Sequence, residues 1–379
     1  MSAPIWSQRP TWLEVDLAAL RHNGEQAKRA VADGVGIWPV IKADGYGVGS
    51  IAAAHALESI ADGFCVAMVE EGEQLRMAGV TKPIVVMSGY YGGLEKRLCR
   101  GELEIFLSDE ADLDYLAGQC EAERPLTINI KVDTGMARLG FTPEAVPALL
   151  KRLDEIPSLR VKGLVTHLAC ADQLDGAVSQ AQVACFKAVL DQPEIAKRAL
   201  VTSIANSAGI LAQPASHAVT TKSWVRPGIM LYGASPFHPQ RTAEEDGLKP
   251  VVRWVSHVQR LVNLEAGQSL GYGHTYTAPS RRLIAQIPVG YADGYNRLLS
   301  NKGEMLLKGV RVPVVGIVCM DSVAVDVTAL DGVESGDEVV VLGSQRGNAI
   351  TLEEMASWLG TIPYEVLTRI SQRVPRRYG

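Results

Sequence analysis

A lysine stands at the end of a short apolar run, directly before a glycine-rich turn. The run is Ile37–Ile41, Lys42 follows it, and three glycines fall within residues 45–49, ahead of an alanine-rich segment from Ser50. Such a run is typical of a buried strand in a parallel sheet. A strand-end lysine is more often a solvated surface charge, but the apolar run favours an enclosed stem, and burial lowers the pKa of an amine. Lys42 is therefore a candidate for a Schiff base with an aldehyde cofactor, with the Tyr46 phenol nearby.

Later apolar runs also end in polar residues. Lys131 stands near the end of one run and Arg138 follows it, His167 closes the next, Ser207 follows the one after, and Arg226 lies in the last. A single histidine after a strand is more often structural than catalytic. In an α/β barrel, however, the carboxyl ends of all strands form the face where chemistry is done, so these side chains are expected to converge.

One group of these residues suits a phosphate. Ser207, Tyr46 and the backbone N–H groups at Gly228 and Ile229 could hold a dianion. Barrels often bind phosphate after their seventh and eighth strands, where N–H groups point at the ligand.

The two arginines suit the rest of such a cofactor. Arg226 could face a pyridine nitrogen and keep it unprotonated, because two positive charges in a dry site repel each other. Arg138 could donate to a phenolate oxygen or to a substrate carboxylate.

The elements that must position these residues alternate between strands and helices. A strand at Trp12–Val15 leads through Asp16, a plausible N-cap, into a helix over about Leu17–Val31. Eight apolar runs then predict strands: Ile37–Lys42, Phe64–Met68, Ile84–Met87, Leu103–Leu107, Leu126–Val132, Val161–His167, Val201–Ile204 and Val225–Leu231. Eight βα repeats indicate a (β/α)8 TIM-type barrel. A doubly wound open sheet is the competing arrangement, although no GxGxxG follows the first strand in register.

The pattern changes after a polar linker at residues 236–248. Short β-rich runs with glycine turns follow, and a helix is expected at Leu352–Leu359. We therefore predict two domains, a barrel over residues 1–240 and a mostly antiparallel β domain over residues 241–379.

Composition narrows the class of protein. The 379 residues are 47% hydrophobic and 21% charged with a net charge of −5, which argues against a nucleic-acid or anionic-membrane surface. No apolar stretch approaches the roughly 20 residues of a membrane span, and Met1–Pro4 begins no secretory signal. The six cysteines have no CxxC spacing, which predicts reduced thiols, no metal site and a cytoplasmic protein.

Several motifs together resemble the signatures of the alanine racemase family. They occur in the family's order between Trp12 and Tyr378, at residues 41–47, 131–140, 226–233, 270–275, 289–297, 318–321, 363–365 and 373–378. Taken together these motifs are highly specific.

The resemblance implies an enzyme that uses pyridoxal 5′-phosphate to interconvert L- and D-alanine with two opposed bases. Lys42 would carry the cofactor and act as the base on one face. Tyr272 would be the base on the other face, reaching the site from the partner subunit of a homodimer. His167 would bond to Tyr272 and contact Arg226. The reaction would supply D-alanine for peptidoglycan or L-alanine for catabolism.

The resemblance also assigns the binding residues. The phosphate would be held by Tyr46, Ser207, Gly228, Ile229 and Tyr364. Arg226 would pair with the ring nitrogen, and Arg138 would contact the phenolate oxygen and the substrate carboxylate. The Met320 backbone N–H of the partner, with Asp321 close by, would add to the carboxylate site.

Further family features concern the surroundings of the site. Tyr291 and Arg297 would line the entrance, and Lys131 matches a lysine that is frequently carbamylated. Three positions depart from the family's usual His, Gln and Arg: Val48, Ser322 and Ile317. They bear on the entrance, on contacts behind the site and on substrate breadth, not on the reaction.

Three alternatives remain open at this stage. A broader amino-acid racemase would also accept serine. A pyridoxal-phosphate decarboxylase of similar architecture would favour an acidic residue at the ring nitrogen, whereas Arg226 is basic. A cofactor-carrying barrel without catalysis would lack residues 241–379.

Overall fold

The computed structural model describes residues 9–88 and 92–379 and divides into two compact units. One unit comprises Leu20–Phe237 and Ala243–Lys249, and the other comprises residues 9–19, His238–Thr242 and Pro250–Gly379. The division predicted at residue 240 thus falls in a short piece of the second unit. The opening strand also belongs to the second unit, because it pairs with strands there.

The first unit is a barrel-like arrangement of eight parallel strands. They are β2 (Gly36–Ile37), β3 (Phe64–Val66), β4 (Ile84–Val86), β5 (Leu103–Leu107), β6 (Leu126–Lys131), β7 (Leu159–Val165), β8 (Val201–Ser203) and β9 (Trp224–Val225). Strands β3 to β8 form a continuous parallel sheet in chain order, and β2 pairs with β9. Single bridges from Val40 to Cys65 and from Thr202 to Ser223 join these two groups. The alternation of strands and helices thus confirms the predicted fold class of the first domain.

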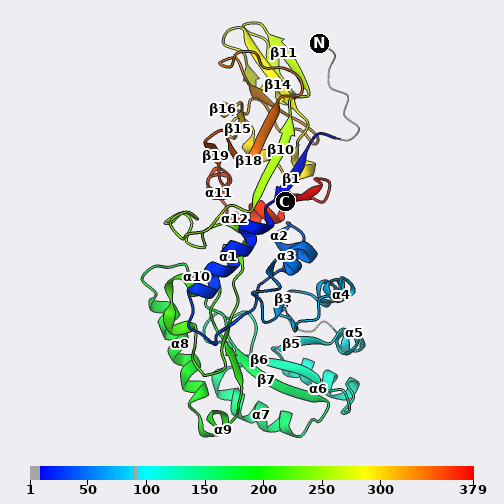
Figure 1. The fold of residues 1–379 in the computed structure, drawn as a ribbon, viewed down its shortest axis with the longest axis vertical. Coiled ribbons are helices and arrows are strands. Elements are labelled where there is room, and N and C mark those ends of the chain that lie inside the picture. The colour runs from blue at the N-terminus through cyan, green and yellow to red at the C-terminus, as the bar shows by residue number, and fades with distance from the viewer. Residues whose placement is uncertain (1–8, 89–91) are drawn as a thin grey trace. The chain divides into compact units, whose positions relative to one another are not determined.

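Helices separate most of these strands along the chain. They are α1 (Leu17–Arg29), α2 (Lys42–Tyr46), α3 (Ser50–Leu57), α4 (Val69–Met77), α5 (Glu95–Arg100), α6 (Glu110–Gln119), α7 (Val146–Asp154), α8 (Ala177–Leu190), α9 (Pro193–Ala196) and α10 (Ser207–Ala212), with 3-10 turns η1 (Pro143–Ala145), η2 (Pro214–Ser216) and η3 (Ile229–Tyr232). Figure 1 shows α4 to α7 on the outside of strands β3 to β7.

Two predicted strands are much shorter than expected. The run Val225–Leu231 forms a strand only up to Val225, because Pro227 cannot donate a ladder hydrogen bond and the chain turns into η3 at Ile229. The run Ile37–Lys42 is likewise interrupted by Pro39, although Val40 still makes its bridge. Both short strands lead directly into segments that carry predicted site residues.

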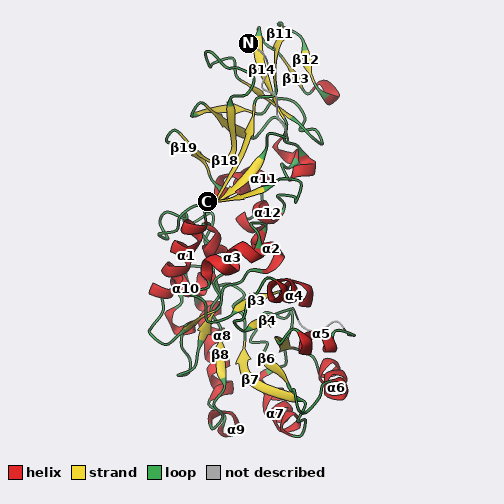
Figure 2. Cartoon of the chain, turned by 45° about the vertical axis from the view of Figure 1, so that its right-hand side comes forward, coloured by secondary structure: helices red, strands yellow, loops and turns green. Residues whose placement is uncertain are grey.

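The second unit is mostly antiparallel, as predicted (Figure 2). Its strands are β1 (Trp12–Val15), β10 (Val252–His257), β11 (Arg260–Leu264), β12 (Ser269–Leu270), β13 (Tyr276–Thr277), β14 (Arg282–Ile287), β15 (Glu304–Leu307), β16 (Val310–Pro313), β17 (Val323–Asp326), β18 (Glu338–Gln345), β19 (Asn348–Ile350) and β20 (Arg376–Tyr378). The larger sheet has the order β16-β15-β18-β10-β1-β20, with β19 on β18, and β11-β14-β17 form a smaller sheet. Only the β1–β20 pair is parallel among these described strands.

Short helical segments complete the second unit. They are α11 (Leu352–Leu359), α12 (Pro363–Thr368), η4 (Tyr272–His274), η5 (Tyr291–Asp293) and η6 (Arg297–Leu299). Helix α11 has the predicted bounds because Thr351 accepts a hydrogen bond from Glu354 N at its start and Gly360 adopts a left-handed conformation at its end. Within residues 9–88 and 92–379, no helix combines the length and the apolar character that a bilayer span requires.

Candidate active site

The glycine-rich segment after Lys42 is a left-handed helical turn. Ala43, Asp44 and Gly45 have φ/ψ values of 53/50°, 52/49° and 60/45°, and Tyr46 has a φ of 54°. A left-handed conformation costs a non-glycine residue about 1–2 kcal/mol, so Ala43, Asp44 and Tyr46 together need support from their surroundings. Strained backbone of this kind is concentrated at functional sites.

Two carboxylates support this turn by accepting backbone N–H groups. Asp44 Oδ1 accepts from Ser50 N at 2.9 Å, which joins the turn to the start of α3. Glu71 Oε1, on α4, accepts from Ala43 N at 2.6 Å. The residue directly after Lys42 is therefore fixed to a neighbouring helix.

The Lys42 amine lies in an environment that favours its neutral form. Burial is the main cause of its lowered pKa, and the Arg138 guanidinium lowers the pKa further, against the opposing effects of Glu71 and Cys65. A free amine is both the nucleophilic and the basic form of lysine. The predicted activation of Lys42 by burial thus has a structural basis.

Arg226 is almost fully buried, at 3% exposure, and is held by neutral groups. Its Nη2 donates to Thr166 O at 2.6 Å and to Ile204 O at 3.1 Å, while Nη1 donates to Ser203 Oγ. Among the described residues no carboxylate pairs with this guanidinium, and burial lowers the pKa of Arg226 to about 10. Arg226 nevertheless remains a cation at neutral pH and its charge is available to a ligand.

His167 lies beside Arg226 and is neutral. The distance from Arg226 Nη2 to His167 Nδ1 is 3.3 Å. Burial lowers the pKa of His167 well below its usual value, and the charges of Arg226, Lys131, Arg138 and Lys42 act in the same direction. The pKa of His167 therefore responds to four of the predicted cations, Arg226, Lys131, Arg138 and Lys42.

A buried glutamine fixes the backbone at His167. Gln182, on α8, is 2% exposed. Its Nε2 donates to His167 O at 3.1 Å and to Thr134 Oγ1 at 3.2 Å, and its Oε1 accepts from Ala169 N at 2.8 Å. The strand-end position of the histidine therefore depends on a side chain from outside the sheet.

Lys131 ends β6 and is 8% exposed. Its pKa is lowered well below the ordinary value, first by burial and then by Arg226 and Arg138. Asp133 is close enough to oppose this effect, but its Oδ1 already accepts from three backbone N–H groups, at residues 135, 136 and 137. Lys131 is thus a buried amine among cations.

The predicted phosphate residues of the barrel, which are Tyr46, Ser207, Gly228 and Ile229, gather where β9 leads into η3. Ser207 Oγ accepts from Gly228 N at 2.8 Å, and a Cβ at Gly228 would lie 2.8 Å from Tyr46 Oη. Tyr46 stacks on Tyr232 at 4.5 Å between ring centroids, which fixes the phenol. Only glycine at residue 228 allows the Ser207 hydroxyl, the Tyr46 phenol and these backbone N–H groups to surround one small space.

The remaining predicted residues lie in the second unit. Tyr272, Tyr291 and Met320 are exposed to 73%, 42% and 52%, and Arg297 is also exposed. Large aromatic and apolar side chains at such exposure often mark a contact surface. The predicted site residues thus fall into two groups. The barrel group lies in the first unit, and the exposed group, in the second unit, consists of Tyr272, Tyr291, Arg297 and Met320.

The backbone beneath the exposed group is tightly packed. Tyr291 N donates to Cys319 O and Ala292 N to Met320 O, both at 3.0 Å. A Cβ at Gly290 would overlap the carbonyl oxygens of residues 319 and 320, so glycine is required for this approach. The side chain of Asp321 is exposed, and its carboxylate accepts a hydrogen bond from Arg373 at 2.6 Å.

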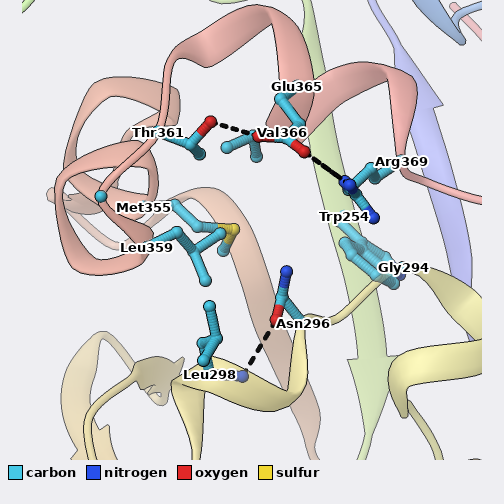
Figure 3. A pocket seen from close by; sticks show the side chains of 11 residues that line it. Trp254, Gly294, Asn296, Leu298, Met355, Leu359, Thr361, Glu365, Val366 and Arg369 are labelled. Atoms are coloured by element: carbon cyan, nitrogen blue, oxygen red, sulfur yellow. Dashed lines mark hydrogen bonds and ion pairs between the residues drawn. The ribbon is translucent and has the colours of Figure 1, made fainter.

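A pocket of about 240 Å³ in the same unit is lined by residues of η6, α11 and α12. Figure 3 shows Leu298, Met355 and Leu359 on its apolar side and Glu365 directed to Arg369. Its lining includes Asn296 and Leu298, which flank the predicted entrance residue Arg297, and Glu365, which follows Tyr364. The Glu365–Arg369 pair, at 2.7 Å, stabilises α12, which carries Tyr364.

Sequence reasoning missed three residues that shape these groups. Glu71 has the weak signal of a capping-box glutamate, three residues after the N-cap of α4. Gln182 is a polar residue on the mostly apolar buried face of α8, and Gly290 precedes one of the recognised tyrosines. None of these sequence signals identifies the backbone groups that Glu71, Gln182 and Gly290 contact.

The barrel group suits an enzyme that uses an aldehyde cofactor with a phosphate group. A desolvated strand-end lysine, a cation without an anionic partner and a glycine cradle suit a phosphate-bearing aldehyde. The fit rests on the cradle, because its donors match a dianion and a Cβ at Gly228 would fill it.

Comparison with known proteins gives the family. The alanine racemase N-terminal domain matches residues 15–236, and the alanine racemase C-terminal domain matches residues 251–378. An alanine racemase of Geobacter sp. strain M21 is 43% identical over 383 residues, covering 97% of this chain and 98% of the relative. The chain therefore belongs to the alanine racemase family and is an isomerase.

Solved structures agree with this assignment. The alanine racemase of E. faecalis has a TM-score of 0.92 at 32% identity, covering 99% of this chain and all of that chain. The alanine racemase from Bartonella henselae, with covalently bound pyridoxal phosphate, has a TM-score of 0.86 at 30% identity and covers 98% of this chain and all of its own.

Proposed function

We propose that this enzyme interconverts L- and D-alanine with pyridoxal phosphate, using Lys42 and Tyr272 as bases on opposite faces of the substrate. The observation that carries the proposal is the barrel group, in which the charges of Lys42 and Arg226 act on His167 and the Tyr46 phenol and the Ser207 hydroxyl flank Gly228. Because the reaction is reversible, the same chemistry would supply D-alanine for peptidoglycan or L-alanine for catabolism.

The barrel residues would hold the cofactor in a defined orientation. Tyr46, Ser207 and the N–H groups of Gly228 and Ile229 would bind the phosphate, joined by Tyr364. When bound, pyridoxal phosphate supplies an electron sink that acidifies the Cα–H bond of an amino acid. Arg226 would face the ring nitrogen and keep it unprotonated, because its own buried charge repels a second proton.

Lys42 would carry the cofactor covalently and, once displaced by substrate, exchange a proton with Cα on one face. Its lowered pKa supports the role, since a base works best when its pKa lies near the operating pH. Arg138 would orient the substrate by donating to its carboxylate and to the cofactor's phenolate oxygen. Binding at two points would hold Cα near the amine.

Tyr272 would exchange the proton on the opposite face. An ordinary phenol has a pKa near 10, so this base needs help at neutral pH. His167 can provide it, because Arg226 donates to Nδ1 and the neutral ring then carries its proton on Nε2. An Nε2–H donor would stabilise the phenolate of Tyr272.

We infer that Tyr272 comes from a second copy of the chain in a homodimer. The exposure of Tyr272, Tyr291 and Met320 supports a surface that a partner covers. In this arrangement the Met320 N–H and Asp321 would meet the substrate carboxylate, and Tyr291 and Arg297 would line the entrance. The domain over residues 241–379 would thus complete the partner's active site.

We also propose that Lys131 is carbamylated. A buried amine among Arg226 and Arg138 is unfavourable as a cation, and carbamylation would replace it with an anion that pairs with them. Intact mass spectrometry should show one carbon dioxide increment that disappears on acidification. An unchanged mass at neutral and acidic pH would contradict this modification.

The test of the reaction is a time course with L-alanine in deuterated water. Chiral chromatography would follow D-alanine, and mass spectrometry would follow Cα deuterium and amine products. D-alanine that carries deuterium, without loss of carbon dioxide, is the expected result. Amine formation would indicate a decarboxylase instead. L-serine in parallel would measure substrate breadth, because one added group in a pocket is worth only about 1–3 kcal/mol.

A further inference from the structure

The left-handed turn after Lys42 meets the N-terminus of α4 through one side chain. Glu71 accepts three backbone hydrogen bonds, from Ala43 N at 2.6 Å, Ala67 N at 2.7 Å and Met68 N at 3.1 Å. Met68 is the N-cap of α4 and Ala67 precedes it, whereas Ala43 directly follows the lysine. A single carboxylate therefore joins two strand-to-helix connections of the barrel, after β2 and after β3.

We propose that Glu71 is a positioning residue for Lys42, which holds the left-handed turn in place and sets the charge that the amine faces. The inference rests on the proposed role of Lys42 as the cofactor lysine. Glu71 itself would not exchange a proton with substrate, because all three of its hydrogen bonds go to backbone groups.

The hydrogen bond from Ala43 N requires a second acceptor oxygen on residue 71, which ordinary helix capping does not need. A glutamate at the third position of a helix commonly accepts the N-cap N–H, here that of Met68. Glu71 additionally uses Oε1 for Ala43 N, so each carboxylate oxygen serves a different segment. Glutamine has only one acceptor oxygen and can keep one of these two connections, not both.

The charge of Glu71 acts on the lysine as well. Burial, and then Arg138, lower the pKa of Lys42, while Glu71 and Cys65 oppose them. His167 also lies in the field of Lys42 and is neutral. The carboxylate is thus the nearby anion that moderates how far the amine is deprotonated.

The experiment compares Glu71→Gln and Glu71→Ala with Glu70→Gln. Glu70 is the adjacent residue in the same helical turn and pairs with Arg97 at 3.0 Å, away from the lysine turn. The first measurement is the pH dependence of Lys42 arylation by fluorodinitrobenzene in the full chain freed of cofactor, followed by peptide mass spectrometry. The second is hydrogen exchange over residues 38–50 in the cofactor-loaded enzyme.

Both Glu71 variants should shift the midpoint of Lys42 labelling to lower pH by at least about 0.5 unit, because an anion near the amine is lost. Exchange over residues 38–50 should become faster, and kcat should fall by at least about tenfold with a smaller change in KM. Glu70→Gln should match the wild type in each measurement.

An unchanged labelling midpoint in folded Glu71→Gln would overturn the proposal, whatever its melting temperature, since a purely structural cap would change stability alone. Equal hydrogen exchange in Glu71→Gln and Glu70→Gln would also overturn it. Failure of the proposed function has a separate signature. In that case the wild type would produce no D-alanine, while the labelling shift between the variants would still be measured.

Discussion

The two units differ in the exposure of most of their predicted site residues, although Arg138 of the barrel is also exposed. In the barrel, Arg226 and Lys131 are 3% and 8% exposed, and Arg226 is fixed by backbone carbonyls. In the second unit, Tyr272 and Met320 are 73% and 52% exposed on short turns. Buried cations with neutral partners are costly alone and favour a bound anion. Exposed side chains on fixed backbone instead suit contact with another surface. The difference supports a division in which the barrel binds cofactor and the second unit serves a partner.

Loss of the barrel lysine should have the largest effect. Lys42→Ala should abolish covalent cofactor attachment and lower racemisation by about 10⁴-fold or more, because nucleophile and base are lost together. Absorbance spectra and chiral chromatography would measure both. The exposed Lys187→Ala on α8 is the control and should be unaffected. Racemisation by Lys42→Ala near the wild-type rate would break the assignment of the chemistry to the barrel.

Tyr272→Phe should leave cofactor attachment and melting temperature unchanged, because the variant keeps the aromatic ring and loses only the hydroxyl of a side chain that is 73% exposed in the single chain. Turnover should fall by about 10²–10⁴-fold in at least one direction, as expected for a lost general base. Tyr115→Phe, also an exposed tyrosine, should retain full activity. Wild-type rates in both directions would show that the second unit supplies no base.

Gly290→Ala should disturb the backbone beneath the exposed group. The added Cβ would overlap the carbonyls of Cys319 and Met320, so we expect a loss of about 1–3 kcal/mol in unfolding free energy and a raised KM. Gly118→Ala, in α6 with no atom within 4 Å of the new Cβ, is the matched control. Equal effects of the two variants would contradict a packed support for Tyr291 and Met320.

The smallest effect concerns acid stability of the barrel. Burial lowers the pKa of His167 well below its usual value near 6.5, so below pH 6.5 the unfolded chain binds a proton that the folded chain resists. Stability should therefore fall with decreasing pH, by at most about 1.4 kcal/mol per pH unit from this residue. Urea titrations between pH 8 and 5 should show a shallower decline for His167→Gln than for the wild type or the exposed His55→Gln. Identical slopes would contradict a buried neutral histidine.

The strand pattern was predictable because eight apolar runs must be buried, and the order of the polar residues after them followed from barrel geometry. The residues at which the strands end could not be predicted. Val225–Leu231 is apolar throughout most of its length, yet Pro227 stops the ladder after Val225. The opening strand Trp12–Val15 shows no sign in sequence that it pairs with Val252–His257, since pairing of distant segments is a tertiary choice.

Within the candidate site, residue types were easier to predict than backbone shape. Glycines at residues 45, 47 and 49 signal a turn, but Ala43, Asp44 and Tyr46 give no local sign of a left-handed conformation. That shape depends on an acceptor from another helix, Glu71, which sequence spacing cannot place beside Ala43.

The most direct test of a shared site is a hybrid dimer of Lys42→Ala and Tyr272→Phe chains. Co-expression with two different affinity tags and tandem purification would isolate it. If the two bases come from different chains, one site in the hybrid has both intact and the other has neither. The account predicts about half of the wild-type activity per dimer, although each parent variant is nearly inactive. A hybrid as inactive as its parents would contradict the shared site and place both bases in one chain.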